Sequence, residues 1–550
     1  MFIKRNRSKQ NGREYSSVLL VQGERVPAKR PPGRPRADAK PPGTKVVHRT
    51  IANLSGMPPE LIAVIEAFCR QQRGGEAPEV AGEPVIGPAY GPLAAMLTLA
   101  RELGIERALG KTRQGRLVLF MVLARVIHRG SRLSSVRWAE SQAVAESLGL
   151  TRFDEDDLYD ALDWLSGQQS RIEKALAPKD CDGAVFLYDV TSSYFEGQQN
   201  ELAAAGYNRD GKKFKKQIVI GLMTDAAGEP VSVQVYEGNR ADPTTVGDQI
   251  DKLASQLGAK EVVFVGDRGM LKGPARELLA QRGYRYVTAL TDPEVRRRLR
   301  EGKLQLDLFG EDVVEVQDEG GQRLLLRRIP ATQQRHRSRR DDQLAKVRVR
   351  VAARNDYVSK RPRANAETSL ELAKRALGAY KLSSWVSAHL EGREVRLTVD
   401  DDAREREEQL DGCYVVTSDV PANVASAQTL WDRYGDLQRV ERDFRRMKVS
   451  KLEIRPIFLR KAERTRAHVL VTMLALKIVR ELERRVAPLG ITSQDALDRL
   501  QSVRLVSFAD PTLGLWRLPT RWLPQQQAVL DVLPPLPPPL LSAQKPTTTA

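Results

Sequence analysis

The sequence has few cysteines and histidines. Three Cys and five His occur among 550 residues, and Cys69, Cys181 and Cys413 lie far apart in the chain. This spacing provides neither the disulfide framework of a small secreted domain nor the paired ligands of a zinc site. We therefore expect reduced thiols, as in a cytoplasmic protein.

Long apolar runs are also absent. The longest candidate, Val469 to Val479, is interrupted by Lys477 and falls short of the roughly 18 residues that a membrane-spanning helix needs. The basic residues at the N-terminus are not followed by an apolar stretch, so they do not begin a secretory signal. No membrane partner is expected.

Acidic residues are outnumbered by basic ones. The chain has 88 Lys and Arg against 70 Asp and Glu, which gives a formal net charge of +18. Residues 1–49 alone contain 13 basic and three acidic residues. A solvated surface usually spreads its charge, so this concentration favours nucleic acid as the partner.

The first 55 residues are predicted to form a basic hairpin or arm. Residues 15–21 and 45–51 have the pattern of short strands, joined by a loop rich in Pro, Lys and Arg. Within the loop, the run Pro-Gly-Arg-Pro-Arg resembles the core of an AT-hook, whose arginines enter a narrow A·T minor groove. Arg34 and Arg36 are therefore predicted DNA contacts, either in a hook or in a generic phosphate-binding loop.

Residues 56–180 are predicted to form a helical DNA-binding domain. Apolar residues recur at spacings of three and four over much of this range. One turn is surrounded by four arginines: Arg125, Arg129, Arg132 and Arg137. Two interpretations stay open, a helix-turn-helix DNA reader and a packing module with a solvated basic edge.

Between residues 181 and 291 the pattern becomes that of an α/β fold. Strand-like runs occur at 184–190, 217–224, 230–236, 261–266 and 284–290, and helical patterns flank the fourth run. This order predicts a mixed sheet with flanking helices, in which a hairpin meander is followed by βαβ crossovers.

Two carboxylates lie at or near the ends of strands that this order places side by side. They are Asp189 and Asp267. An unpaired carboxylate is costly in an apolar layer, so the two are candidates for binding a hard cation. Oxygen-only ligands favour Mg²⁺ or Mn²⁺ over zinc.

A third acidic ligand is expected from a helix packed on that sheet. The pattern predicts a helix over 424–448, one face of which carries Tyr434, Leu437, Glu441 and Lys448. An ordinary ion pair of Glu441 with Arg445 would also explain the acidic residue. Together with the two strand carboxylates, Glu441 completes an Asp/Asp/Glu triad.

The chain resembles the DDE transposases of bacterial insertion sequences, in the subgroup with a Tyr-Arg-Glu-Lys signature. The resemblance covers roughly residues 85–490, and these segments carry it in order: 187–191, 236–239, 265–269, 434–448, 454–457 and 467–468. It implies an RNase H-like fold, with Asp189, Asp267 and Glu441 as the catalytic, metal-binding triad.

The resemblance also implies a cofactor, partners and a reaction. Two Mg²⁺ ions, with Mn²⁺ as a substitute, would support cleavage and transfer of DNA strands by in-line attack on phosphodiester bonds. The partners would be double-stranded DNA of the transposon ends and target, and a second copy of the chain in a synaptic homodimer. The location would be the bacterial cytoplasm, in association with the nucleoid.

Three further DNA contacts follow from the matched motifs. Tyr434 and Lys448 stand at the signature positions that contact phosphates, and Arg268 directly follows the second Asp. Each of the three is predicted to contact DNA.

One position departs from the signature. Leu437 stands where the subgroup has Arg, so Arg439 or Arg433 would have to supply the missing charge. Residue 437 shares the helix face of Glu441, so we predict that it faces the site and that Leu437→Arg is tolerated, with a cleavage rate that is raised or unchanged. If it is a packed core residue, a buried charge would be costly.

The remaining segments complete the predicted organisation. Residues 181–291 and 412–490 would form the catalytic core, interrupted by a β-rich or mixed insertion at 292–411, and 491–550 would be a partly disordered tail. In the insertion, dense positive charge is predicted to contact the DNA backbone. Trp385 would either stack on an extruded base or belong to the core.

Three functions are compatible with these features. They are an active transposase, a catalytically inactive transposase-derived DNA-binding protein, and an RNase H-like nuclease. The acidic triad favours the first, since a pure DNA-binding protein gains little from carboxylates placed against phosphate. The large insertion and the basic N-terminal segment disfavour a simple nuclease.

The charge of the N-terminal segment can be tested directly. Deleting residues 1–49 removes 13 basic and three acidic residues, so affinity for duplex DNA should fall and the plot of log affinity against log salt should flatten. The measurement is a fluorescence titration at several salt concentrations. An unchanged slope would show that this segment does not contact phosphate.

Overall fold

The computed structural model describes most of the chain. The described residues are 2–10, 13–27, 44–55, 62, 65–66, 69, 85–179, 183–207, 209–212, 214–318, 320–450, 452–454, 457–510 and 514–537. Arg34 and Arg36 of the predicted AT-hook lie outside them. The chain divides into two compact units, which we describe separately: Met1–Leu99, Ser134–Phe153 and Glu483–Ala550 form the first, and Ala100–Leu133 with Asp154–Leu482 the second.

The first unit contains two small antiparallel sheets. One has the order β1-β2-β3, with β1 (Phe2–Gln10), β2 (Arg13–Pro27) and β3 (Thr44–Asn53). The other has the order β16-β15-β4, with β4 (Val85–Ala89), β15 (Arg504–Asp510) and β16 (Gly514–Pro519). Two helices belong here as well, α18 (Ser493–Leu500) and α19 (Pro524–Asp531). The sequence pattern did not predict β1 or these C-terminal elements.

Residues 91–176 are helical, as the spacing of their apolar residues predicts. They contain α2 (Gly91–Glu102), α3 (Ile105–Leu109), α4 (Arg113–Ile127), α5 (Arg132–Ala139), α6 (Val144–Leu148), α7 (Glu155–Ser166) and α8 (Gln169–Leu176). Of these, α2, α5 and α6 fall mainly in the first unit, and α3, α4, α7 and α8 in the second. Thr112 begins α4 by accepting a bond from the Gly115 amide, and Asp154 begins α7 in a capping box. None of the described helices is long and apolar enough to cross a membrane.

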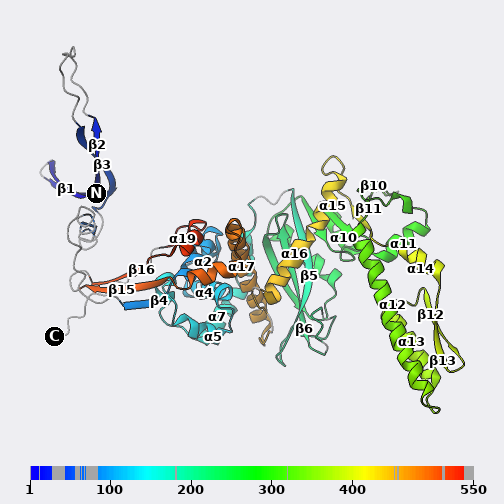
Figure 1. The fold of residues 1–550 in the computed structure, drawn as a ribbon. Helices are drawn as coiled ribbons and strands as arrows, with labels where there is room; N and C mark the ends of the chain where they lie inside the picture. The colour runs from blue at the N-terminus through cyan, green and yellow to red at the C-terminus, as the bar shows by residue number, and fades with distance from the viewer. Residues whose placement is uncertain are drawn as a thin grey trace, which may run out of the picture. The chain divides into compact units, whose positions relative to one another are not determined.

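An eight-stranded mixed sheet forms the centre of the second unit, with the order β10-β11-β14-β9-β8-β5-β6-β7 (Figure 1). Its strands are β5 (Ala184–Tyr194), β6 (Gln217–Asp225), β7 (Pro230–Glu237), β8 (Val262–Gly266), β9 (Arg285–Ala289), β10 (Val314–Gln317), β11 (Arg323–Arg328) and β14 (Cys413–Ser418). β5, β6 and β7 form an antiparallel meander, and β8 and β9 run parallel to β5. The predicted α/β fold with an RNase H-like mixed sheet is therefore confirmed.

The two faces of this sheet differ in what covers them. On one face, Tyr188 and Phe264 lie with ring centroids 5.9 Å apart in a core shared with α9 (Val246–Ser255) and α10 (Gly273–Gln281). Side chains alternate along a strand, so Asp189 points to the opposite face from Tyr188. That second face is where α16 (Leu437–Arg445) packs against β5 and β6.

The helix predicted over residues 424–448 is divided into three segments. α15 (Ala427–Gly435) is followed by α16 and then by a π-helical turn, Arg446–Ser450. α17 (Ala462–Val486) comes next along the chain. α16 buries Leu437, Val440, Asp443 and Phe444, at the spacing of a single helix face. Leu437 is only 6% exposed, so the expectation that it faces the site and tolerates Arg is wrong.

The insertion joins the core at one end and has its own apolar centre at the other. β10 and β11 extend the main sheet, next to α11 (Asp292–Arg300). The rest consists of α12 (Pro330–Ser359), α13 (Ala366–Ala379), β12 (Val386–Glu391), β13 (Glu394–Val399) and α14 (Asp401–Glu408). A short 3₁₀ turn, Leu306–Leu308, also lies in the insertion, and two others lie outside it, at Asp242–Thr245 and Ala487–Leu489. The insertion is thus mixed rather than β-rich.

Trp385 belongs to the core of this insertion. It is 3% exposed and packs with Leu344, Val347 and Leu377, so its ring offers no open face to an extruded base. The 30-residue helix α12 was not predicted. Its apolar seam, spaced by three and four residues from Leu344 to Val351, is narrow and lies among many basic residues.

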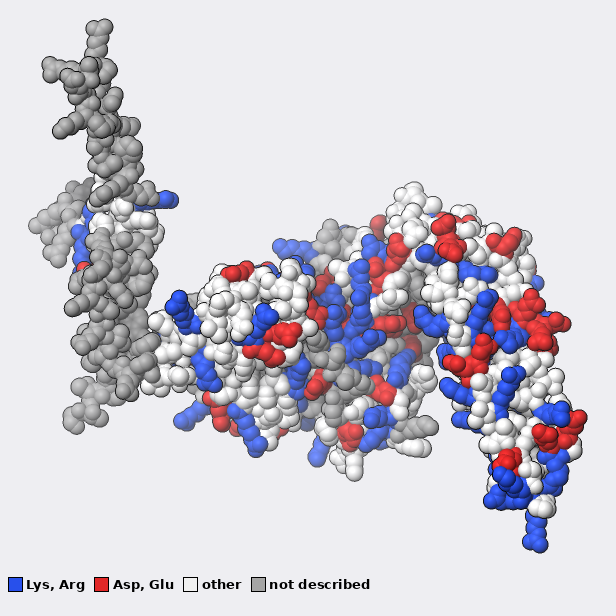
Figure 2. Space-filling view, viewed as in Figure 1, with Lys and Arg blue, Asp and Glu red and all other residues white. Residues whose placement is uncertain are grey.

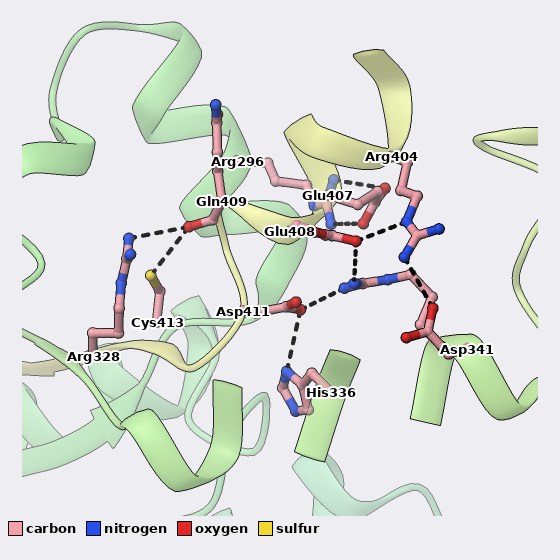
Figure 3. Close-up of polar contacts among 11 residues, drawn as sticks. Arg296, Arg328, His336, Asp341, Arg404, Glu407, Glu408, Gln409, Asp411 and Cys413 are labelled. Atoms are coloured by element: carbon pink, nitrogen blue, oxygen red, sulfur yellow. Dashed lines mark hydrogen bonds and ion pairs between the residues drawn. The ribbon is translucent and has the colours of Figure 1, made fainter. Parts of the chain in front are cut away.

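A network of ion pairs connects α12 to α14 and the start of β14 (Figure 3). Arg340 lies 2.6 Å from Asp411 and 3.3 Å from Glu408. Arg404 lies 2.8 Å from the same Glu408 and 2.9 Å from Asp341. Because Arg340 and Asp411 are both nearly buried, these contacts hold the insertion on the core more firmly than exposed pairs would.

The burial of Leu437 leads to a stability prediction. Leu437→Arg would place an unpaired charge in the interface between α16 and the sheet, and should lower the free energy of unfolding by about 2–5 kcal/mol. Gln438→Arg, at the exposed next position, is the matched control and should melt like the wild type. A wild-type melting temperature for Leu437→Arg would contradict the placement of this side chain.

Candidate active site

Parallel pairing of β5 with β8 brings the two strand carboxylates together. The register pairs Tyr188 with Gly266, so the next residues along the two strands, Asp189 and Asp267, are neighbours at the end of the paired region. Gly269 has a φ of 78° in the turn that follows, a conformation that favours glycine. The chain can therefore leave the sheet immediately after Asp267.

Asp189 is held in a strongly unfavourable place for a negative charge. Burial, and then the negative charges of Asp267 and Glu441, raise its pKa to about 7. A hydrogen bond from the Val190 amide, 2.7 Å from Asp189 Oδ1, and the charge of Arg209 act in the opposite direction. Three carboxylates from three separate segments thus interact at this point.

Glu441 reaches the pair from the helix that covers this face. It lies on an exposed position of α16, the helix packed on β5, and its charge acts on Asp189. The ion pair with Arg445 that would have explained Glu441 as a surface residue is not among the contacts of the described residues. Within those residues, no group of three or more Asp, Glu, His or Cys side chains is placed so that it could hold a metal ion.

Tyr434 lies directly against the second carboxylate. Its hydroxyl donates a hydrogen bond of 3.3 Å to Asp267 Oδ1. Burial and the charge of Asp267 raise the pKa of this hydroxyl, so it stays protonated and can act only as a donor to the carboxylate. The structure therefore brings together four of the predicted site residues: Asp189, Asp267, Glu441 and Tyr434.

Lys448 is paired with a carboxylate that sequence reasoning missed. Its Nζ lies 3.0 Å from Asp210 Oδ1, and both side chains are nearly buried. Asp210 Oδ2 also accepts a hydrogen bond of 3.0 Å from the Tyr194 amide at the end of β5. Asp210 falls in a polar loop without periodicity, so no sequence signal pointed to it.

The arginines proposed to replace the signature Arg point elsewhere. Arg439 donates to the Ala226 carbonyl at 2.8 Å and lies 3.1 Å from Asp436. Arg433 also pairs with Asp436, at 3.1 Å. Neither makes a described contact with the three carboxylates. Arg209, which the sequence did not single out, is the arginine whose charge acts on Asp189.

Arg268 lies beside the same site. Its guanidinium is 2.6 Å from Asp292 and stacks over the Tyr414 ring at 5.0 Å. Its charge opposes, without cancelling, the rise in the pKa of the Tyr434 hydroxyl. An arginine at this point adds positive charge next to the acidic cluster.

The family model described as Transposase DDE domain matches residues 180–478. No curated protein sequence matches the chain. A solved structure of a piggyBac transposase synaptic complex with hairpin DNA is similar over 82% of this chain and 84% of that chain, with 10% sequence identity and a TM-score of 0.36.

The raised pKa of Asp189 predicts a pH dependence of stability. The folded protein holds a proton on Asp189 from the ordinary Asp pKa of 3.8 up to about 7, whereas the unfolded chain loses it near the lower value. Stability of the metal-free protein should therefore fall as pH rises through this window, by at most about 1.4 kcal/mol per pH unit.

Thermal melts across the same window test this dependence. Asp189→Asn should flatten the pH profile, because the group that binds the extra proton is gone. Equal slopes for Asp189→Asn and wild type would contradict the assignment of the shift to this carboxyl.

Proposed function

This chain belongs to the DDE transposase family, and we propose that it is an active transposase that cleaves and joins DNA strands at Asp189, Asp267 and Glu441. One observation carries the proposal. Burial and two neighbouring carboxylates raise the pKa of Asp189 to about 7. None of the three carboxylates makes an ion pair with a described basic residue, so together they form a negative cluster that is suited to a cation.

The donor set fits divalent metal ions of the hard type. It consists of carboxylate oxygens without nitrogen or sulfur, which favours Mg²⁺ or Mn²⁺. We propose that Asp189, Asp267 and Glu441 would hold two such ions. When bound, they would supply charge neutralisation at the scissile phosphate and a lowered pKa for the attacking water or 3′-hydroxyl.

The surrounding side chains would position the carboxylates and the DNA. The Tyr434 hydroxyl, by donating to Asp267 Oδ1, fixes the orientation of that carboxylate and leaves its other oxygen for a cation. The ion pair of Lys448 with Asp210 would hold the Lys448 ammonium in a fixed position before DNA binds. Arg209 is paired with Asp242, but it is the arginine whose charge acts on Asp189. It is therefore our candidate for the phosphate contact that Leu437 cannot make.

The charge of the chain suits duplex DNA as the substrate. Figure 2 shows Lys and Arg side chains over the face where α16 lies and along the insertion, with Asp and Glu among them. The excess of 88 basic over 70 acidic residues would attract a polyanion. Recombination joins two DNA ends, so we propose that the active form is a homodimer.

A catalytically inactive DNA-binding protein is the second candidate. It would have no need of an uncompensated acidic cluster, since carboxylates beside phosphate oppose binding. The energetic penalty at Asp189 therefore favours catalysis over binding alone.

Strand cleavage assays test the proposal. Asp189→Asn, Asp267→Asn and Glu441→Gln should each lower the Mg²⁺-dependent cleavage rate on the order of 10³-fold or more. Binding to the same DNA in EDTA should equal or exceed that of the wild type, because removing a carboxylate beside phosphate removes a repulsion. Asp432→Asn, an exposed carboxylate on α15, is the control and should cleave normally. Wild-type cleavage by Asp267→Asn would sink the assignment.

A further inference from the structure

A polar pocket in the second unit, apart from the three carboxylates, has a strong excess of positive charge. It has a volume of about 530 Å³. It lies among the turn between α4 and α5, the start of α7, and lining residues within 453–454 and 457–468. Six basic side chains line it: Arg125, Arg129, Arg132, Arg460, Lys461 and Arg464. Among the described residues of this lining, the acidic ones are Glu155 and Glu453. The site carboxylates Asp189, Asp267 and Glu441 are not part of it.

Two of these arginines are buried, and the carboxylates whose charges act on them, Glu453 on Arg125 and Glu155 on Arg132, do not reach ion-pair distance. Burial and the neighbouring charge of Arg132 lower the pKa of Arg125 to about 10. The same kind of burial lowers the pKa of Arg132. Neither arginine makes an ion pair with any residue that the structure describes. Two buried like charges are costly unless an anion lies between them.

The polar contacts of Arg132 do not neutralise it. Its Nη2 lies 3.3 Å from His468 Nδ1 and its guanidinium 5.1 Å from the Tyr159 ring centroid, while its buried Nε has no hydrogen-bond partner. Arg125 has one long contact, 3.5 Å from Nη1 to the Arg129 carbonyl. Both guanidinium groups therefore keep donor capacity for a ligand.

His468, which contacts Arg132, is a neutral imidazole. Its Nε2 lies 3.3 Å from the Ile454 carbonyl and must donate to it, which leaves Nδ1 as the acceptor for Arg132. Burial and the charges of Arg132 and Arg125 hold the pKa of this imidazole well below its ordinary value. The ring is thus a neutral acceptor that orients Arg132.

Arg464 provides a contrast within the same lining. It is bound to Asp163 by two hydrogen bonds of 2.7 Å, a fork that raises its pKa. A structural arginine in this pocket is therefore paired with a carboxylate. Arg125 and Arg132 have no such carboxylate partner among the described residues, so we infer that they do more than stabilise the fold.

The pocket is tied to the strand that carries Asp189. Ile457, which lines it, forms a bridge with Phe195 directly after β5, and its carbonyl accepts a bond of 3.0 Å from the Glu196 amide. Phe195 lies six residue steps after Asp189, or roughly 20 Å at about 3.3 Å per step. A DNA strand could span that distance with about six base-pair steps of 3.4 Å.

We propose that this pocket binds a backbone phosphate of the DNA, with Arg125 and Arg132 as the two donors. The proposal rests on the proposed function, since it takes the transposase's DNA as the ligand. The anion would relieve the repulsion between the two guanidinium groups and accept bonds from them. Phe458, which lines the same pocket and is 65% exposed, would offer an apolar face to the sugar or base beside that phosphate.

Binding of a duplex oligonucleotide in EDTA tests the pocket without cleavage. Arg125→Gln and Arg132→Gln should each weaken binding about 3- to 10-fold and reduce the slope of log affinity against log salt by about one unit. Lys174→Gln, an exposed basic residue on α8 outside the pocket, is the charge-matched control. Affinity and slope equal to wild type in both pocket variants would overturn the inference and leave the proposed function standing. Absence of DNA binding by the wild type would overturn both.

Thermal melts separate an anion site from a structural one. The wild type should melt higher in sodium phosphate than in sodium chloride of equal ionic strength, and Arg132→Gln should lose this difference. In chloride, Arg132→Gln should melt at or above the wild-type temperature, because a like charge next to Arg125 is removed. A lower melting temperature in chloride together with wild-type DNA affinity would assign both arginines a structural role. If the glutamine variant fails to fold, Arg132→Lys should fold and retain the phosphate effect only in part.

Discussion

The parallel pairing of β5 with β8 is the constraint on which the rest of the site depends. It sets Tyr188 opposite Gly266 and so makes neighbours of Asp189 and Asp267 at the point where the paired region ends. Two close carboxylates destabilise the fold, and the buried core on the other face of the sheet, where Tyr188 and Phe264 pack, offsets this energetic penalty. A strained electrostatic arrangement can persist because the packing around it fixes both strands.

The molecule contains two uncompensated charge clusters of opposite sign within one unit. The acidic cluster raises the pKa of Asp189, and the basic pocket lowers the pKa of Arg125. In each case burial makes the largest contribution, and a like charge adds to it. Such pairs are expected where ligands of opposite charge complete the site. Metal cations at one cluster and a phosphate at the other would serve the same strand of DNA.

The insertion is integrated with the core at its base. Its first hairpin, β10 and β11, continues the main sheet beside β14, and the ion pairs around Arg340 and Asp411 attach α12. Its remaining elements enclose a separate core that includes Trp385. The long separation in sequence between Asp267 and Glu441 therefore does not separate them in space, because the chain returns to the sheet through β14 before it enters α15.

The sequence by itself determined the mixed sheet, the neighbouring positions of Asp189 and Asp267, and a helix that carries Glu441. These features follow from local periodicity and strand order, which are properties of short segments. Leu437 was wrongly predicted to face the site because it lies one helical turn from Glu441, and sequence spacing puts both residues on one helix face. Only the packing of α16 on β5 shows that Leu437 is buried and Glu441 exposed. The pairing of Lys448 with Asp210, the pairing of β4 with β15, and the meeting of Arg125 and Arg132 with His468 were decided by the tertiary structure alone. Each joins segments that are distant in sequence, and no local pattern records which distant segment will be the neighbour.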